Sequence, residues 1–268
     1  MAYRLVATDI DGTLLNPDKT ASEATREAIA ALRARSIPVV LVTGRPLAMA
    51  LRVHQQLGLV GPVIACTGAL LYDPHQSRVL AHRFIPREIA LRAVAAIRRV
   101  APTTSITADL EDEWHLDRIE DERHYRLTGG MIPILGGVER TIPHSTREVT
   151  AISFRPMSIR TQVEEAFQQD GLTEHLHTTS ASQVVDIIAT GVNKGAALER
   201  LTGLLGIPLT ETAALGDDEN DLPLLQAAGL GIAMGNAPDS VKAVAAATTG
   251  PNTADGWAEA IWRHVLDG

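Results

Sequence analysis

The chain has 268 residues, 45% of them hydrophobic, and carries a formal net charge of −8. No apolar run approaches the ~20 residues that a membrane-spanning helix needs, and no cluster of lysine and arginine offers a basic surface for nucleic acid or anionic membranes. The length exceeds that of one average domain, so we expect two domains with neither a membrane nor a nucleic-acid partner.

Two carboxylates follow the first apolar run. The pattern predicts a strand over residues 4–9 that ends at Asp9, with Asp11 and Gly12 directly after it. Gly12 lets the chain turn, so Asp9 and Asp11 can converge on one point. One carboxylate can then act as a nucleophile while the other transfers a proton. An Asp-rich turn whose side chains only cap backbone amides is the alternative interpretation.

A second buried strand is predicted over residues 37–43, after a helix over 22–35. It leads into Thr43 and Gly44, ahead of a helix predicted over 47–57. The N-terminus of a helix that is preceded by glycine can bind an anion with its free backbone amides. The Thr43 hydroxyl and these amides are therefore expected to face one site. Thr43 as a simple helix cap is the other interpretation, and the two are compatible.

The alternation of strands and helices changes after a strand over 62–66 and a hairpin at residues 70–81. Residues 84–188 show a mixed pattern, which predicts an α+β domain inserted into a core domain formed by residues 1–83 and 189–268. The inserted part has predicted helices over 87–100, 117–126 and 158–169, short alternating segments over 103–116, and strands over 148–155, 173–178 and 184–188.

Lys194 stands at a loop-to-helix junction, ahead of a helix predicted over 196–205. Of the 24 basic residues only Lys19, Lys194 and Lys242 are lysines. A lysine at such a junction, in a chain that otherwise uses arginine, suggests that a compact ammonium is needed there. An exposed surface lysine is the alternative.

A further apolar strand, predicted over 212–216, runs into four acidic residues within the five positions from Asp217 to Asp221, before a helix over 221–228 and a strand over 230–234. Close carboxylate pairs repel by roughly 4 kcal/mol at moderate dielectric. A divalent cation removes that cost, and donors that are all oxygens favour Mg²⁺ over Zn²⁺. A solvated acidic loop is the alternative.

Asp9, Thr43 and Asp217 each follow the carboxyl end of a predicted parallel strand. Ligands bind at that edge of doubly wound sheets. The sequence therefore predicts an α/β fold, a Rossmann-like doubly wound parallel-sheet core with an inserted α+β domain.

These segments, in this order, resemble the four motifs of the haloacid dehalogenase superfamily of phosphohydrolases. The segments 231–237, 252–256 and 258–261 narrow the resemblance to the Cof-type branch with a type IIB cap. The resemblance covers roughly residues 1–83 and 184–268. It implies a Mg²⁺-dependent phosphatase for small phosphorylated metabolites, sugar phosphates especially, with the inserted domain as a cap that selects the leaving group.

The resemblance also implies roles for individual residues. Asp9 would attack phosphorus and become an aspartyl-phosphate, while Asp11 would act as general acid and then general base. Mg²⁺ would bind the carboxylates of Asp9 and Asp217 and the backbone carbonyl of Asp11. Asp221 would contact the groups that surround the ion, or it would orient Lys194. The residues expected to hold the phosphoryl oxygens are Thr43, Gly44, Lys194 and Asn220.

One residue departs from the family pattern. Thr67 stands where the family commonly has Asn before Gly-Ala, which leaves the leaving-group contact of that amide without a counterpart. A phosphomutase would share the same motifs, and a non-catalytic phospho-ligand-binding protein is the alternative outside enzymes. The lone Cys66 is expected to be buried and inert, which fits a cytoplasmic protein. The sequence leaves the oligomeric state open.

Overall fold

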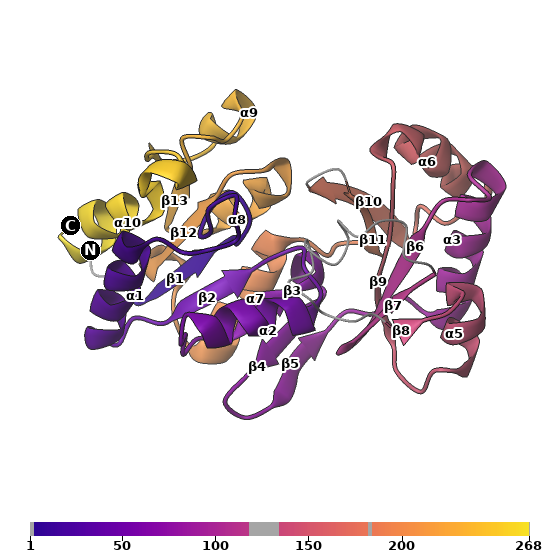
Figure 1. The fold of residues 1–268 in the computed structure, drawn as a ribbon, viewed down its shortest axis with the longest axis horizontal. Coiled ribbons are helices and arrows are strands. Elements are labelled where there is room, and N and C mark those ends of the chain that lie inside the picture. The colour runs from indigo at the N-terminus through magenta and orange to yellow at the C-terminus, as the bar shows by residue number, and fades with distance from the viewer. Residues whose placement is uncertain (1–2, 118–133, 182–183, 268) are drawn as a thin grey trace. The chain divides into compact units, whose positions relative to one another are not determined.

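The computed structural model describes residues 3–117, 134–181 and 184–267 (Figure 1). The chain forms two compact units. The core unit contains residues 1–43, 50–81 and 193–268, and the inserted unit contains residues 44–49 and 82–192. In the described part, no helix is both long enough and apolar enough to cross a membrane.

The core unit is built on an eight-stranded sheet in the order β14-β13-β12-β1-β2-β3-β4-β5. The strands from β14 to β3 are parallel to their neighbours, and β4 is antiparallel to β3. Parallel strands that are covered on both faces have continuous apolar sequences. The strands are β1 (Leu5–Thr8), β2 (Val39–Val42), β3 (Val63–Ala65), β4 (Leu70–Asp73), β5 (Arg78–His82), β12 (Thr212–Gly216), β13 (Leu230–Ala233) and β14 (Ala247–Thr248).

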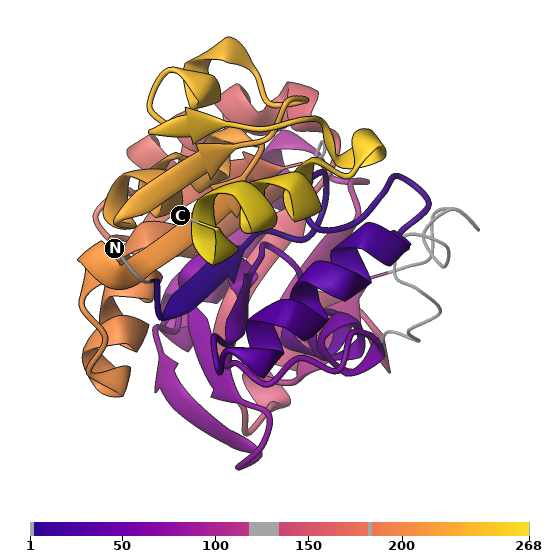
Figure 2. The ribbon, with the colours of Figure 1, turned by 90° about the vertical axis from the view of Figure 1, so that its left-hand side faces the viewer.

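Helices cover both faces of this sheet. Leu5 and Ala7 of β1 pack in one cluster with residues of α7 and α8, including Leu198. The side chain of Thr8 lies on the other face, because side chains alternate along a strand, and it accepts a hydrogen bond from Trp257 Nε1 of α10 (2.9 Å). Figure 2 shows α1 and the C-terminal helices side by side on that face. This arrangement confirms the predicted doubly wound α/β class. The helices are α1 (Glu23–Ala34), α2 (Leu47–Gln56), α7 (Lys194–Leu205), α8 (Leu222–Ala227), α9 (Asp239–Lys242), α10 (Gly256–Ala260) and the π-helix η6 (Ile261–Leu266), and short 3₁₀ turns are η1 (Cys66–Gly68), η3 (Leu209–Glu211), η4 (Glu219–Asp221) and η5 (Asn252–Ala254).

The inserted unit has a six-stranded sheet in the order β10-β11-β9-β6-β7-β8, antiparallel except for the β7–β8 pair. Its apolar face packs against helices, with Ile106 and Ile152 of the sheet in one core with Ile97, Ile142 and Phe167. One-sided burial of this kind is usual for antiparallel sheets. The elements are α3 (Arg87–Val100), β6 (Ile106–Leu110), β7 (Glu113–Leu116), β8 (Ile134–Leu135), α5 (Val138–His144), β9 (Val149–Phe154), η2 (Met157–Ile159), α6 (Arg160–Gln169), β10 (Leu176–Ala181) and β11 (Val184–Ala189).

The structure corrects several predicted boundaries. The strand predicted over 173–178 is β10, three residues later, because turn hydrogen bonds after α6 still hold His175 and Leu176 to the carbonyl of Leu172. Helix α7 begins at Lys194, before the predicted residue 196, because the Asn193 side chain caps it by accepting from the Ala196 amide. The helix predicted over 117–126 lies, apart from its first residue, outside the described residues.

Candidate active site

Three of the predicted residues lie at one edge of the core sheet. Asp9 directly follows β1, Thr43 follows β2 and Asp217 follows β12. Strands β12, β1 and β2 are adjacent and parallel, so their carboxyl ends meet at the same edge. The Asp9 amide donates to the Leu215 carbonyl (3.0 Å), which continues the ladder and fixes the start of the Asp9 turn.

Lys194 lies at the centre of the acidic residues and is fully buried. Its Nζ is 2.7 Å from Asp9 Oδ1 and 2.5 Å from Asp221 Oδ1. The lysine is the first residue of α7, where the Asn193 cap fixes the start of the helix. The ammonium therefore joins the turn after β1 to the loop after β12.

The acidic loop is folded around the carboxylate of Asp221. Its Oδ2 accepts hydrogen bonds from the backbone amides of Asp217 (3.0 Å) and Asp218 (3.1 Å). The Asp217 carboxylate accepts from Thr13 Oγ1 (2.7 Å) and from Asn236 Nδ2 (3.1 Å). Both carboxylates are thus oriented by groups from several loops.

Thr13 and Asn236 were not among the residues predicted for the site. Thr13 belongs to the Asp-Gly-Thr segment after β1, and Asn236 lies in the segment 231–237 that carried the family resemblance. Both signals were present in the sequence, but only folding brings these two side chains to Asp217. The Trp257–Thr8 contact was also missed, and it matters because the Thr8 hydroxyl in turn donates to the Asp9 carbonyl (2.8 Å).

Gly12 is required by the close approach of the two acidic turns. Its φ is +83°, and a Cβ at this position would lie 2.2 Å from Asp217 Oδ2. Any side chain would therefore push the Asp217 carboxylate away from its present position, besides straining the backbone.

Burial and repulsion from neighbouring carboxylates make Asp9 and Asp217 hard to ionise. Burial raises the pKa of Asp9 to about 8, with Lys194 opposing the shift and Asp221 and Asp217 adding to it. Burial likewise raises the pKa of Asp217 to about 7, opposed by the Thr13 hydrogen bond. Burial acts against the charged form of Lys194 as well, but Asp221 and Asp9 outweigh it and raise the pKa of the ammonium above its ordinary value.

These residues fit a hard divalent cation. One carboxylate oxygen from each of Asp9, Asp217 and Asp221 lies within 4.8 Å of the others. When all three carboxylates are ionised, one ammonium leaves negative charge that a cation can offset. The donors are all oxygens, which suits Mg²⁺. Within the described ranges Asp11 is not a member of this group of carboxylates. Its carboxylate is partly exposed and forms an ion pair with Lys19 Nζ (2.6 Å).

The remaining predicted residues are close in sequence to the strand ends at this edge. Thr43 is buried, and its carbonyl accepts from the Thr67 amide (2.9 Å). Asn220 is buried in η4, between the cap residue Asp218 and Asp221. Gly44 lies in the bend directly after Thr43 and belongs by its contacts to the inserted unit.

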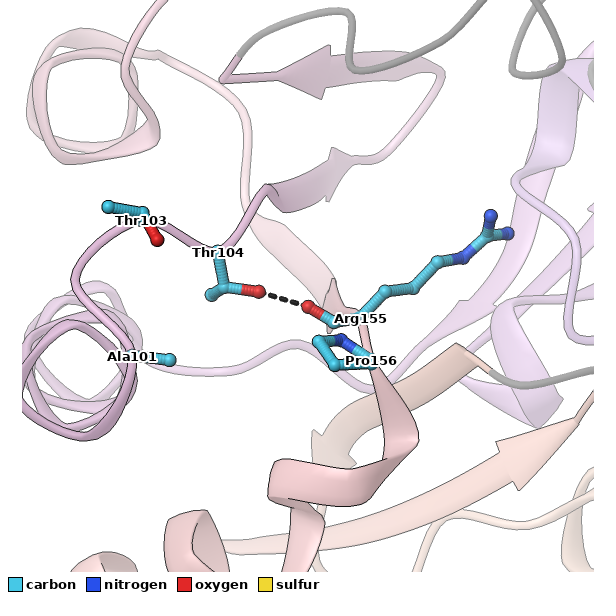
Figure 3. A pocket seen from close by; sticks show the side chains of 5 residues that line it. All are labelled: Ala101, Thr103, Thr104, Arg155 and Pro156. Carbon is cyan, nitrogen blue, oxygen red and sulfur yellow. Dashed lines mark hydrogen bonds between the residues drawn. The ribbon is translucent and has the colours of Figure 1, made fainter.

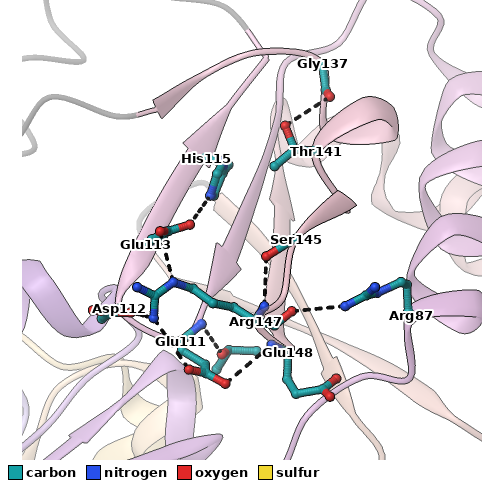
Figure 4. Close-up of polar contacts among 11 residues, drawn as sticks. Arg87, Glu111, Asp112, Glu113, His115, Gly137, Thr141, Ser145, Arg147 and Glu148 are labelled. Carbon is teal, nitrogen blue, oxygen red and sulfur yellow. Dashed lines mark hydrogen bonds and ion pairs between the residues drawn. The ribbon is translucent and has the colours of Figure 1, made fainter. Parts of the chain in front are cut away.

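The inserted unit has an ionic cluster of its own, shown in Figure 4. Arg147 Nε is 2.9 Å from Glu113 Oε1, and the same guanidinium also pairs with Asp112 and Glu111. His115 Nε2 is 3.0 Å from the other oxygen of Glu113. Both basic side chains of this cluster therefore contact neighbouring acids of the same unit.

The inserted unit also has a surface hollow of about 370 Å³. Figure 3 shows its lining, in which the Thr104 hydroxyl donates to the Arg155 carbonyl. The lining contains no carboxylate, thiol or imidazole, and it consists of Ala101, Thr103, Thr104, Arg155 and Pro156. The acidic edge of the core sheet is therefore the stronger candidate for chemistry.

Known proteins resemble the whole chain. The family model of haloacid dehalogenase-like hydrolases matches residues 6–261. Pyridoxal phosphate phosphatase YbhA of Escherichia coli is 30% identical over 99% of this chain and 100% of its own length. The 5-amino-6-(5-phospho-D-ribitylamino)uracil phosphatase YitU of Bacillus subtilis is 30% identical over 94% of each chain.

A solved structure agrees with these matches. A sugar phosphatase of HAD subclass IIB superposes with a TM-score of 0.83 at 24% identity, over 97% of this chain and 98% of that one. At this identity the likeness shows that the fold is shared. The two sequence relatives, in turn, share this chain's length and carry the names of phosphatases.

Proposed function

The chain belongs to the haloacid dehalogenase-like hydrolase family, as a phosphatase, and from this premise we propose that it is a Mg²⁺-dependent phosphomonoester hydrolase that works through phosphorylation of Asp9. One observation carries the proposal: the buried Lys194 holds Asp9 and Asp221 at the sheet edge where Asp217 directly follows β12. That edge is where a doubly wound sheet binds its ligand.

Asp9 is the nucleophile in this proposal. One of its oxygens forms a bond to phosphorus while the bond from phosphorus to the leaving oxygen breaks, which gives an aspartyl-phosphate. The contact with Lys194 Nζ holds the carboxylate in one orientation and favours its ionised form against the effect of burial. Water then attacks phosphorus, breaks the acyl-phosphate bond and restores the Asp9 carboxylate.

Asp11 is the proton carrier. It gives a proton to the departing oxygen in the first step and takes one from the attacking water in the second, so it ends as it began. Its place on the turn two residues beyond Asp9, partly exposed, suits exchange with a substrate better than the buried Asp9 does. The ion pair with Lys19 has to open for this transfer.

Mg²⁺, when bound, would supply positive charge that offsets the carboxylates and polarises the phosphoryl group. The carboxylates of Asp9 and Asp217 and the backbone carbonyl of Asp11 would hold the ion. Asp221 would hold the surrounding groups in place, because one of its oxygens already binds Lys194 and the other accepts from two backbone amides.

Positioning of the phosphoryl oxygens falls to Lys194, Thr43, Gly44 and Asn220. An ammonium has three donors, and contacts with Asp9 and Asp221 account for two of those of Lys194. The third donor would serve a phosphoryl oxygen. Phosphoryl transfer depends mostly on such positioning and on charge stabilisation.

The substrate class proposed is a small phosphorylated metabolite, probed first with sugar phosphates. The two relatives named above act, by their names, on pyridoxal phosphate and on a phosphorylated ribitylaminouracil. We also propose that residues 84–188 act as a cap that selects the leaving group. A cytoplasmic location belongs to the proposal too, and the buried Cys66, the single cysteine of the chain, favours it.

Phosphate release from a panel of phosphomonoesters tests the proposal. We expect turnover with Mg²⁺, loss of turnover with a chelator, and recovery when Mg²⁺ is added back. Activity that survives thorough chelation, or that is highest with Zn²⁺, would contradict the metal assignment. Turnover that requires a sugar bisphosphate would instead identify a phosphomutase.

A further inference from the structure

Lys19 occupies a backbone position that favours glycine. Its φ is +66°, in the left-handed region. Its amide donates to the Asn16 carbonyl (2.9 Å), and the Asn16 amide donates to the Thr20 carbonyl (2.8 Å). This pair of hydrogen bonds is the pattern of a three-residue hairpin loop, in which a turn is followed by one left-handed residue, usually glycine. A lysine at this position is strained, and strained residues concentrate at functional sites.

The Lys19 side chain contacts the proposed proton carrier. Its Nζ lies 2.6 Å from Asp11 Oδ1. The turn that carries the lysine is held firmly, because the Asp18 carboxylate accepts from both the amide (3.0 Å) and the hydroxyl (2.7 Å) of Thr20. The chain between the two residues returns to Asp11 through an isolated bridge with Leu15. The left-handed turn therefore places an ammonium against the Asp11 carboxylate.

Stability does not explain this ion pair. The Lys19 and Asp11 side chains are 41% and 26% exposed, and exposed ion pairs contribute little to the free energy of unfolding. Arg4 and Glu211 form another exposed pair in the same unit, with Nη1 3.0 Å from Oε2, and it involves none of the residues assigned to the site. The feature that distinguishes the pair of Lys19 is its acidic member, Asp11.

We propose that Lys19 is a positioning residue for proton transfer by Asp11. This inference rests on the proposed phosphatase function. A carboxylate on an exposed turn has rotational freedom, which it must lose to reach the departing oxygen or the attacking water. The ammonium holds the Asp11 side chain in one arrangement before each transfer. The pair opens during the transfer, and the rigid turn keeps the ammonium in place for the pair to form again.

This role predicts different effects on the two chemical steps. Phosphorylation by an aryl phosphate whose leaving group needs no protonation does not use Asp11, whereas hydrolysis of the aspartyl-phosphate does. A sugar phosphate needs Asp11 in both steps. The ratio kcat/KM reports the phosphorylation step, and kcat includes hydrolysis as well. A fault in the position of Asp11 therefore lowers kcat and KM together for the aryl ester, but it lowers kcat/KM for the sugar phosphate.

The test compares Lys19→Met with the matched control Arg4→Met, which breaks the other exposed ion pair. The wild type and both variants are assayed with Mg²⁺ on p-nitrophenyl phosphate and on a sugar phosphate. For Lys19→Met we expect kcat on the aryl ester to fall about ten-fold with kcat/KM unchanged, and kcat/KM on the sugar phosphate to fall by a similar factor. Arg4→Met should keep the kinetics of the wild type.

Two further variants at the same position separate positioning from stability. Lys19→Gly relieves the strain of the left-handed backbone, so Tm should be no lower than in the wild type, while kcat should fall as in Lys19→Met. Lys19→Arg keeps the positive charge, and its kinetics should lie closer to the wild type than those of Lys19→Met. A structural role for the ion pair would instead make stability and turnover fall together in Lys19→Gly.

Other outcomes would overturn the inference. An equal loss of kcat/KM on both esters in Lys19→Met would show that the ammonium contacts the phosphoryl group. Kinetics of Lys19→Met that match those of Arg4→Met would show that Asp11 needs no help from Lys19. A lower Tm for Lys19→Gly would identify the ion pair as structural. Each of these results, with an active wild type, refutes the inference alone, whereas a wild type inactive on every ester would refute the proposed function as well.

Discussion

Replacing Lys194 by methionine removes the ammonium that Asp9 and Asp221 share, at 2.7 and 2.5 Å. Methionine has a similar length and is apolar, so the fully buried site keeps its packing while the carboxylates lose their counter-charge. Removal of one partner of a buried ion pair costs about 3–5 kcal/mol in the free energy of unfolding. With a shift of about 2–4 °C per kcal/mol for a domain of this size, Tm should fall by about 6–20 °C.

The loss should depend on pH in a defined direction. Burial raises the pKa of Asp9 to about 8 and that of Asp217 to about 7 in the presence of Lys194. A carboxyl group with a raised pKa in the folded state stabilises the fold at low pH, and that stability is lost as pH rises through the folded pKa. Without the ammonium these pKa values rise further, so the gap in Tm between wild type and variant should be small at pH 5 and open towards pH 8.

The assay is thermal unfolding followed by circular dichroism at pH 5 and pH 8 in the absence of divalent cations. Lys242→Met is the matched control, because it makes the same substitution at a lysine of another helix, in the last turn of α9. We expect the control to stay close to wild type at both pH values. A fall in Tm for Lys194→Met that is no larger than in the control, or that is the same at both pH values, would refute this reasoning.

Two further predictions concern the metal. Asp217→Asn keeps the shape of a proposed ligand and removes its charge, so the Mg²⁺ concentration for half-maximal activity should rise at least about ten-fold. The control is Glu219→Gln, which changes an exposed acid of the same loop and should leave that concentration unchanged. Equal values in both variants would contradict the ligand role of Asp217. Mg²⁺ binding should release protons at pH 6, when the raised pKa values keep Asp9 and Asp217 largely protonated, and few at pH 9. Titration calorimetry in two buffers of different ionisation enthalpy measures this release, and binding heats that do not depend on the buffer at pH 6 would contradict it.

The core sheet could be predicted because its strands have one simple pattern. Val39–Val42 is an unbroken buried run, as expected for a parallel strand covered on both faces, and the acids come directly after such runs. The positions of Asp9 and Asp217 at a common edge follow from that pattern alone. The residue pattern alone could not show that Lys194 is buried and bound to two carboxylates, because those partners are distant in the chain. Only the family resemblance offered Asp221 as a residue that could orient Lys194.

Other features depend on context that a linear pattern does not carry. Helix α5 contains Pro143 and follows Gly136 and Gly137, so propensity argues against it, and it forms because Val138 and Ile142 pack into the core of the inserted unit. The sequence showed Thr67 as a departure from the family pattern. Its positive φ and unsatisfied hydroxyl became visible only in three dimensions.

The most direct measurement is to trap the phosphoenzyme in Asp11→Asn with an aryl phosphate whose leaving group needs no protonation. The variant should still phosphorylate Asp9, but hydrolysis of the intermediate loses its general base, a loss of about 10²- to 10⁴-fold. We expect a rapid burst of the phenol, slow turnover afterwards, and the phosphoryl group mapped to Asp9 by peptide analysis, with no burst when Asp9→Asn is added. Phosphate found on Asp11 in the wild type, or full steady-state activity in Asp9→Asn, would contradict the assignment of Asp9 as the nucleophile.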